Sequence, residues 1–151
     1  MLLRTAPLLA AALTALAAIA ATPPSASTRD GVYTAAQAEA GARLYATRCA
    51  MCHGRALEGT FEIPGLGDRF MAHWSNAPLS NLHDYVGRAM PQFAPGSLTP
   101  DDTTNIIAFL LQANGLPAGS AALPSEAGAL ARITVQPADL KLTARAVPRT
   151  Q

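Results

Sequence analysis

Cysteine and histidine meet in one short stretch of the chain, which holds both cysteines of the sequence. Residues 48–59 read RCAMCHGRALEG, so that Cys49 and Cys52 are separated by two residues and His53 directly follows the second thiol. Four kinds of chemistry use closely spaced thiols: a structural disulfide, a dithiol redox pair, a zinc site and covalent attachment of haem. The rest of the sequence distinguishes between them.

A disulfide between Cys49 and Cys52 would close a very short loop and would restrain little of the unfolded chain. A dithiol redox pair is typical of a βαβ setting, which this sequence lacks. Zinc needs further ligands, but the chain has no second cysteine pair, and the spacing of His73 and His83 fits no zinc-finger pattern. The sequence C-x-x-C-H is the signature of covalent haem attachment, in which the adjacent histidine lies beneath the iron. We therefore predict one haem c, held by Cys49, Cys52 and His53.

The second axial ligand of that iron decides what the protein can do, because an open position allows ligand chemistry and a filled one favours electron transfer. Met90, in the stretch RAMPQF, is the best candidate. Pro91 fixes its own φ and disfavours helical geometry at Met90, so we expect the thioether to extend from a non-helical strap. The strap lies far enough from His53 in sequence to reach the opposite haem face.

Four other side chains could compete with Met90 for the iron: Met51, Met71, His73 and His83. Met51 lies within the attachment loop, which should keep it on the side of His53. Met71 and His73, in RFMAHW, belong to a stretch whose apolar side chains are expected to line the haem edge. His83 is expected on the polar side of a short helix, in contact with solvent.

The elements that position these residues are predicted to be helices, and the fold class is all-α. Thr34 and Gln37 form a capping box for a helix that runs to Arg48, with Cys49 at its end. Residues 54–78 are rich in glycine and proline and should be irregular. Ser80 should cap a short helix with Leu82, Tyr85, Val86 and Ala89 at helical spacing, which ends before Pro91.

The last long helix has a clear start and stop. Thr99 is the expected N-cap, Pro100 occupies the first helical position, and Asp101 and Asp102 lie in the positive first turn. The helix should end at residues 114–115, which read Asn-Gly. A short helical turn is expected at 126–133, and a loose end after Pro137. Aromatic residues make up only 5% of the chain, which indicates that something other than side chains fills part of the interior.

The N-terminus predicts export. Arg4 precedes an uncharged run over residues 8–21, and Ala18-Ile19-Ala20 has the small-x-small pattern of a cleavage site. The run is too short for a membrane-spanning helix, so residues 1–20 are predicted to be a signal peptide and the mature chain a periplasmic protein without a membrane span. Formal charge of the full chain is +1, with no basic surface for nucleic acid.

The chain resembles the class I c-type cytochromes over about residues 31–119. The resemblance rests on Gly41 and Tyr45 in the first helix, CAMCH, Met90-Pro91, and Phe109 and Leu110 in the last helix. It implies the cytochrome c fold, with three to four helices around one covalently attached haem. The chain is thus predicted to have four segments: the signal peptide, a flexible leader over 21–30 that is rich in Pro, Ser and Thr, the cytochrome domain over 31–119, and an extension over 120–151. The resemblance implies that this extension is docked up to about residue 135, and the rest is predicted to be disordered.

The same resemblance implies further site residues. Pro64 would accept a hydrogen bond from the Nδ1 hydrogen of His53, and Arg69 and Trp74 would bond the haem propionates. His53 and Met90 would be the iron ligands.

In finer detail the stretches FEIPGLGDRFMAHW and MPQFAPGSLTPDD resemble cytochrome components of quinoprotein dehydrogenases in Gram-negative bacteria. The predicted function is one-electron transfer from a periplasmic dehydrogenase to a respiratory acceptor, by a monomer or complex subunit that is no enzyme by itself. A fixed subunit of a dehydrogenase or oxidase complex, and a ligand sensor or peroxidase with a labile Met90, are the alternatives.

Overall fold

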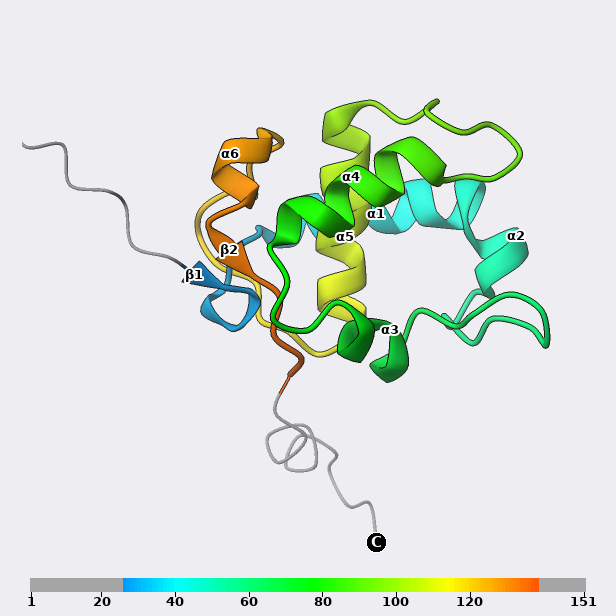
Figure 1. The fold of residues 1–151 in the computed structure, drawn as a ribbon, viewed down its shortest axis with the longest axis horizontal. Helices are drawn as coiled ribbons and strands as arrows, with labels where there is room; N and C mark the ends of the chain where they lie inside the picture. Colours follow the sequence, from blue (N-terminus) through cyan, green and yellow to red (C-terminus); the bar gives the residue numbers. More distant parts are fainter. Residues whose placement is uncertain (1–25, 139–151) are drawn as a thin grey trace, which may run out of the picture.

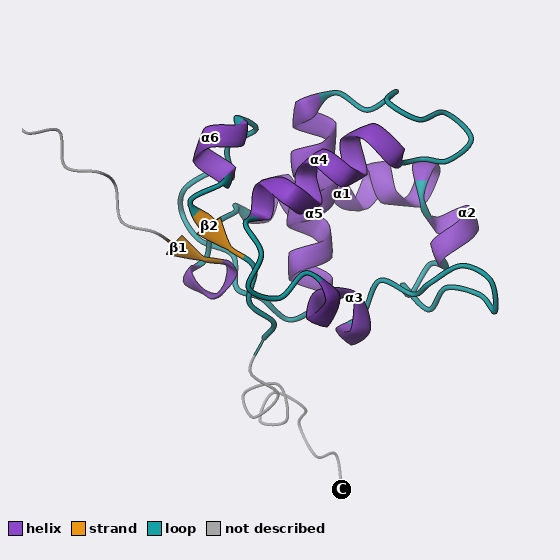
Figure 2. Ribbon diagram, viewed as in Figure 1, coloured by secondary structure: helices purple, strands orange, loops and turns teal. Residues whose placement is uncertain are grey.

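Three helices of more than ten residues form the frame of the fold (Figure 1). The computed structural model describes residues 26–138. In chain order its elements are β1 (Ala26–Ser27), the 3-10 helix η1 (Thr28–Asp30), α1 (Ala35–Arg48), α2 (Ala50–His53), α3 (Asp68–His73), α4 (Leu79–Ala89), α5 (Pro100–Ala113), α6 (Ala127–Leu130) and β2 (Ile133–Thr134). The all-α class predicted from the sequence is confirmed, and Figure 2 shows how little strand the chain contains.

Helix α1 begins where the capping box predicted it. The Thr34 hydroxyl accepts a hydrogen bond from the Gln37 backbone N–H at 3.3 Å, and the Gln37 side chain accepts one from the Thr34 backbone N–H at 3.2 Å. These bonds satisfy N–H groups that have no partner within the helix. The Gln37 side chain also bonds both backbone groups of Leu123, which ties the C-terminal extension to the start of α1.

Helices α1 and α5 cross in close contact at a glycine. A Cβ atom at Gly41 would lie 1.8 Å from the backbone oxygen of Asn105, so no side chain fits at that position. One turn along α1, the ring of Tyr45 packs on that of Phe109 with a centroid separation of 5.0 Å. The glycine permits the close approach, and the aromatic pair fills the space beside it.

Helix α5 is the central element of the bundle. It starts as predicted, with the Thr99 hydroxyl accepting from the Asp102 N–H at 3.1 Å and Pro100 at the first position. Its apolar side chains are buried around most of the helix because α1 and α4 pack on different sides of it. Asn114 caps the end of α5. Its side chain donates a hydrogen bond to Leu66 O at 2.9 Å and so fixes the loop that precedes α3.

The structure corrects three predictions for the helices. Residues 54–78 are not irregular throughout, because they contain α3, whose start has no side-chain cap. Helix α4 begins at Leu79 with Pro78 as N-cap, so Ser80 lies inside the first turn and caps nothing. The expected three to four helices are too few for residues 26–138, where α2, α3 and α6 add short helices to the three long ones.

The leader and the tail form a short parallel strand pair that the sequence did not predict. Ala26 pairs with Ile133 and Ser27 with Thr134. The expected flexible leader is therefore ordered from residue 26, and Thr28 is fully buried. Two-residue strands carry no alternating pattern, so the sequence offered no local signal for them.

Some predictions fall outside the described residues. The signal peptide over 1–20 and the chain end over 139–151 lie there, and the domain boundaries at 31–119 and 120–151 remain predictions. Within residues 26–138, no helix combines the length and the apolar character needed to cross a membrane.

Candidate functional site

The cysteine-histidine stretch forms a single helical turn at the end of α1. Cys49 caps α1 through its N–H to Tyr45 O, and its own carbonyl accepts the N–H groups of Cys52 and His53 at 3.1 and 2.9 Å. Gly54 ends the turn with a φ of 80°, which favours glycine. Positions i, i+3 and i+4 share one helix face, so the two thiols and the imidazole are presented to the same side.

That side borders a cavity of about 970 Å³. Its volume is within the range for small-molecule and cofactor sites. All seven predicted site residues line it: Cys49, Cys52, His53, Pro64, Arg69, Trp74 and Met90. They come from α2, the loop before α3, α3 itself and the end of α4, so the fold brings together residues that are far apart in sequence.

The His53 imidazole is oriented by the loop opposite it. Its Nδ1 lies 2.9 Å from the backbone oxygen of Pro64. A carbonyl can only accept, so Nδ1 carries the hydrogen and Nε2 keeps a free lone pair. Such a bond fixes the imidazole plane and increases its basicity as a metal ligand. The loop is fixed in turn by hydrogen bonds from Gly59 N to His53 O and from Leu66 N to Leu57 O, both at 2.9 Å.

Met90 reaches the cavity from a different element. It follows the last residue of α4 in extended geometry, with φ −116° and ψ 150°, as the adjacent Pro91 predicted. Its side chain is half-buried against the core and lines the cavity. The imidazole of His53 and the thioether of Met90 therefore enter one space from two separate helices.

The competing side chains are placed less favourably. Met51 lies at the cavity rim with 80% of its surface exposed. Met71 is 2% exposed and belongs to the hydrophobic core, so the expectation that it lines the cofactor edge is wrong for its side chain. His73 does line the cavity. His83 is half-buried and not simply solvated, because its Nε2 lies 3.2 Å from Pro100 O and 3.1 Å from the Thr104 hydroxyl oxygen.

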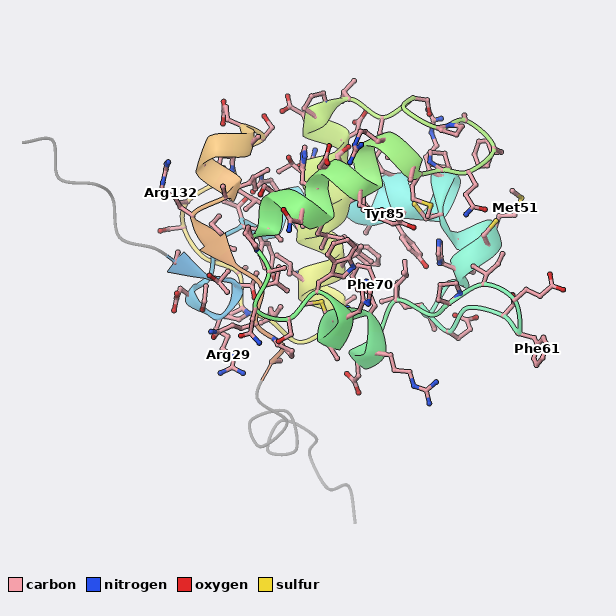
Figure 3. All side chains as sticks on the ribbon, in the orientation of Figure 1. Arg29, Met51, Phe61, Phe70, Tyr85 and Arg132 are labelled. Atoms are coloured by element: carbon pink, nitrogen blue, oxygen red, sulfur yellow. The ribbon has the colours of Figure 1, made fainter. Side chains whose placement is uncertain are left out.

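Aromatic rings make up much of the cavity wall. Five of the eight aromatic residues line it: Tyr45, Phe70, Trp74, Tyr85 and Phe93. The Trp74 ring lies 5.6 Å from that of Tyr85, 5.2 Å from His73 and 6.5 Å from Phe70, measured between centroids. Figure 3 places Phe70 and Tyr85 centrally, between α3 and α4, and Met51 and Phe61 at the periphery.

Two of these lining residues were not predicted to face the cavity. Tyr85 was predicted only as an apolar position of α4, yet it is 45% exposed and lines the cavity, and Phe93 was given no role. Phe70 lies in RFMAHW, whose apolar side chains were expected at the haem edge, and it does line the cavity. The low aromatic content of the chain was the available signal. Because most of its few rings line the cavity, the core elsewhere consists mainly of aliphatic side chains.

Cys49 does not have the electrostatics of a redox-active thiol. Burial raises the pKa of Cys49 to about 11, with a further contribution from Cys52 that Arg48 partly offsets. Dithiol oxidoreductases need the opposite shift, since the thiolate is their nucleophile. Both thiols are free. The residues that the structure describes contain no group of three or more His, Cys, Asp or Glu side chains that could hold a metal ion.

Tyr45 supports the attachment turn from the side of α1. Burial is the main reason that the pKa of Tyr45 is raised to about 12, followed by the negative charges of Cys49 and Glu58 when ionised. Its hydroxyl donates to Gly54 O at 2.6 Å. The tyrosine is thus a neutral donor at physiological pH and fixes the end of α2 to α1.

Tyr45→Phe should therefore lower the free energy of unfolding by about 1 kcal/mol, because one partly buried hydrogen bond is lost while the ring contact with Phe109 remains. Denaturant unfolding of both proteins measures the difference. Tyr85→Phe is the control, and a loss of the same size in that variant would show that the Gly54 bond is not responsible.

The donor set fits the haem c that the sequence signature implies. Two thiols on one turn can bond to the two vinyl groups of one porphyrin, while His53 Nε2 and the Met90 sulfur are free to ligate iron. The remaining wall is largely apolar and aromatic, and its charged or polar side chains are Arg48, Glu62, Arg69, His73 and Gln92. A large planar apolar ring system with carboxylates at its edge suits this lining.

Comparison with known proteins finds similarity to subunits of cytochrome c oxidases. A profile of the family described as cytochrome C oxidase, cbb3-type, subunit III matches residues 36–110. The cbb3-type cytochrome c oxidase subunit CcoP of Rubrivivax gelatinosus is 33% identical over 85 residues, which cover 51% of this chain and 26% of that protein. The match thus spans only about a quarter of the relative.

Among solved structures, the sulfane dehydrogenase SoxCD from Paracoccus pantotrophus is similar, with a TM-score of 0.47 and 25% identity. That similarity covers 84% of this chain and 72% of the other.

Proposed function

The chain belongs to the class I c-type cytochromes, and on that premise we propose that it is a monohaem protein that carries one electron at a time between protein partners. Electron transfer is the shared role of such domains, and their haem c is covalently bound. One observation carries the proposal for this chain: Cys49, Cys52, His53 and Met90 all face a single apolar cavity.

Each residue has a distinct role in this proposal. Cys49 and Cys52 would tether the porphyrin through thioether bonds, and His53 and Met90 would bind its iron. The bound haem supplies an iron that alternates between the ferric and ferrous states. The Met90 sulfur is a neutral soft donor that favours the ferrous state, and the apolar wall acts in the same direction because it disfavours the additional charge of the ferric state.

Further side chains would hold the periphery of the haem. Pro64 keeps the His53 plane fixed through its carbonyl, as described above. Arg69 and Trp74 line the same wall, and we assign their guanidinium and indole N–H groups to the haem propionates.

Absorption spectra of the purified ferric and ferrous protein, with a pyridine haemochrome assay, test the proposal. We expect a c-type spectrum, pigment that stays with the polypeptide in acid-acetone, and loss of covalent pigment in Cys49→Ser/Cys52→Ser. Pigment that acid-acetone strips cleanly from the wild-type chain, or a mature mass without the porphyrin, would overturn it. Carbon monoxide should leave the Soret band of the reduced protein unchanged at neutral pH, whereas a shift would favour a sensor or peroxidase.

We place the mature protein in the periplasm, with residues 1–20 removed as a signal peptide. Its partners in the proposal are a dehydrogenase that donates the electron and an oxidase or second cytochrome that accepts it, without nucleic acid. A fixed complex subunit is the second candidate, because the oxidase relative is itself named as a subunit. Migration as a free monomer in size-exclusion chromatography would support the carrier, and co-purification at equal stoichiometry with a dehydrogenase or oxidase would support the subunit.

Turnover with the partner should depend only weakly on ionic strength. Residues 29–119 contain six arginines and eight acidic residues, for a formal charge of −2 before the propionates are counted. Such a small charge steers association little, and screening it with salt changes little. Steady-state reduction rates between low and moderate salt measure this, and a steep fall with salt would contradict the prediction.

A further inference from the structure

The corner between α3 and α4, residues 74–78, sets where Trp74 lies in the cavity wall. Trp74 is the last residue of the α3 turn, and its ring packs on Tyr85 of α4 at 5.6 Å. Any change in the course of the corner would therefore move this ring. Trp74 is also the only tryptophan of the chain, which makes it a specific reporter.

The corner has few hydrogen bonds of its own. Ala77 N bonds to Trp74 O at 3.1 Å, and Ser75 N to Ala72 O at 3.2 Å. Asn76 adopts a φ of 63°, in the left-handed region that is unfavourable for a residue with a side chain, although asparagine tolerates it best. A conformation of this kind persists only where the surroundings fix it.

The C-terminal tail provides that fixation. Asn76 N donates to Val135 O at 2.8 Å, and Val135 N donates to Ala77 O at 2.9 Å. Beside them, Pro78 forms an antiparallel bridge with Thr134. The tail thus pairs with both sides of the left-handed residue.

The tail is itself held on its other edge. β2 pairs with β1, and the buried Thr28 hydroxyl donates to Gln136 O at 2.8 Å and accepts from Gln136 N at 2.9 Å. The side chains of Leu130 and Val135 are fully buried. Figure 1 shows this assembly of β1, β2 and α6 on the side of the molecule away from α2, so it supports the cavity wall from outside the site.

We propose that residues 133–135 act as a positioning strut, which fixes the α3–α4 corner through Asn76 and Ala77 and thereby holds Trp74 against the cofactor. The expected effect on the haem rests on the proposed function. The strut itself consists of backbone hydrogen bonds within this chain. It lies outside residues 36–110, to which the family profile extends. The environment of the cofactor is thus set in part by a segment beyond the matched domain.

A chain ending at Arg132 tests the strut, with a chain ending at Ala138 as the control that keeps every described residue. In the holoprotein, loss of the Val135 carbonyl should accelerate hydrogen exchange of the Asn76 amide by about tenfold or more. Trp74 emission should rise as the ring leaves its fixed position near the haem, and the midpoint potential should shift. The chain ending at Ala138 should match the full chain in all three measurements.

Val135→Pro is the second variant, in case the chain ending at Arg132 does not fold. It removes the N–H that bonds Ala77 O and leaves the length of the tail unchanged. Leu123→Ala is the matched control for lost stability. It truncates a side chain that is 3% exposed in the same extension, at a residue whose backbone bonds the Gln37 side chain at the start of α1.

The outcomes separate the possible roles of the tail. Faster Asn76 exchange and increased Trp74 emission in Val135→Pro, but not in Leu123→Ala, support the strut. A lower melting temperature in both, with Asn76 exchange and Trp74 emission unchanged, would show that the tail only covers the core and would overturn the proposal. Absence of covalent pigment from the full chain would overturn the proposed function instead, and Asn76 exchange would still decide the strut.

Discussion

Met90→Ala is expected to abolish the thioether-to-iron charge-transfer band at the red end of the ferric spectrum and to lower the midpoint potential. The sulfur is the soft neutral donor that favours ferrous iron, and alanine offers no replacement ligand. Because axial ligands span about 0.8 V of haem potential, a decrease on the order of 0.1 V or more is expected. Redox titration with optical detection measures both effects.

The same variant should convert the protein from a carrier to a ligand-binding haem protein. Without the Met90 sulfur, carbon monoxide should bind the reduced form and shift its Soret band. The Soret band of the wild-type protein should not shift. Met51→Ala is the matched control, because Met51 lines the same cavity from its exposed rim and should leave the spectrum unchanged. A charge-transfer band that survives in Met90→Ala would mean that another side chain binds the iron, and His73, which lines the same cavity, is the first to test.

Gly41→Leu should have the largest effect on stability. A Cβ atom alone would lie 1.8 Å from Asn105 O and 2.4 Å from its carbonyl carbon, and both are backbone atoms that cannot turn aside. Helices α1 and α5 must separate to admit it, which also separates Tyr45 from Phe109. We expect a loss of more than about 3 kcal/mol, a large share of the stability of a small domain.

Gly41→Ala and Gly87→Ala form the matched pair for this prediction. Gly87 also lies within a helix, but a Cβ there would be 3.5 Å from the nearest atom, the Thr103 hydroxyl oxygen, which is ordinary contact. Its replacement should be neutral or stabilising by about 0.5–1 kcal/mol, since alanine is the better helix former. Thermal and denaturant unfolding compare the variants. Similar unfolding curves for Gly41→Ala and the wild type would show that the crossing tolerates a side chain and does not require glycine.

Neither glycine substitution should alter the axial ligands. Gly41 is not among the residues that line the cavity, so the spectrum of the folded fraction should keep the wild-type features. Met90→Ala should thus change the spectrum with little change of the fold. Gly41→Leu should change the stability with little change of the spectrum.

Local signals were enough to predict most of the frame. The capping residues Thr34 and Thr99 placed the starts of α1 and α5, because a cap acts on N–H groups only two or three residues away. Proline next to Met90 predicted its extended geometry for the same reason. Helix α4 began one residue before the predicted cap at Ser80, since packing of Leu79 into the core determines that start and no side-chain cap is made.

The sequence by itself determined the chemistry of the attachment turn, because Cys49, Cys52 and His53 are brought together by one helical turn. Only the tertiary structure decided which distant residues complete the site. Tyr85 and Phe93 line the cavity together with residues of α2 and α3, and the tail pairs with the corner at Asn76 through hydrogen bonds between residues more than fifty positions apart in sequence. Such long-range pairings depend on how the helices pack as a whole, and no spacing within a local window encodes them.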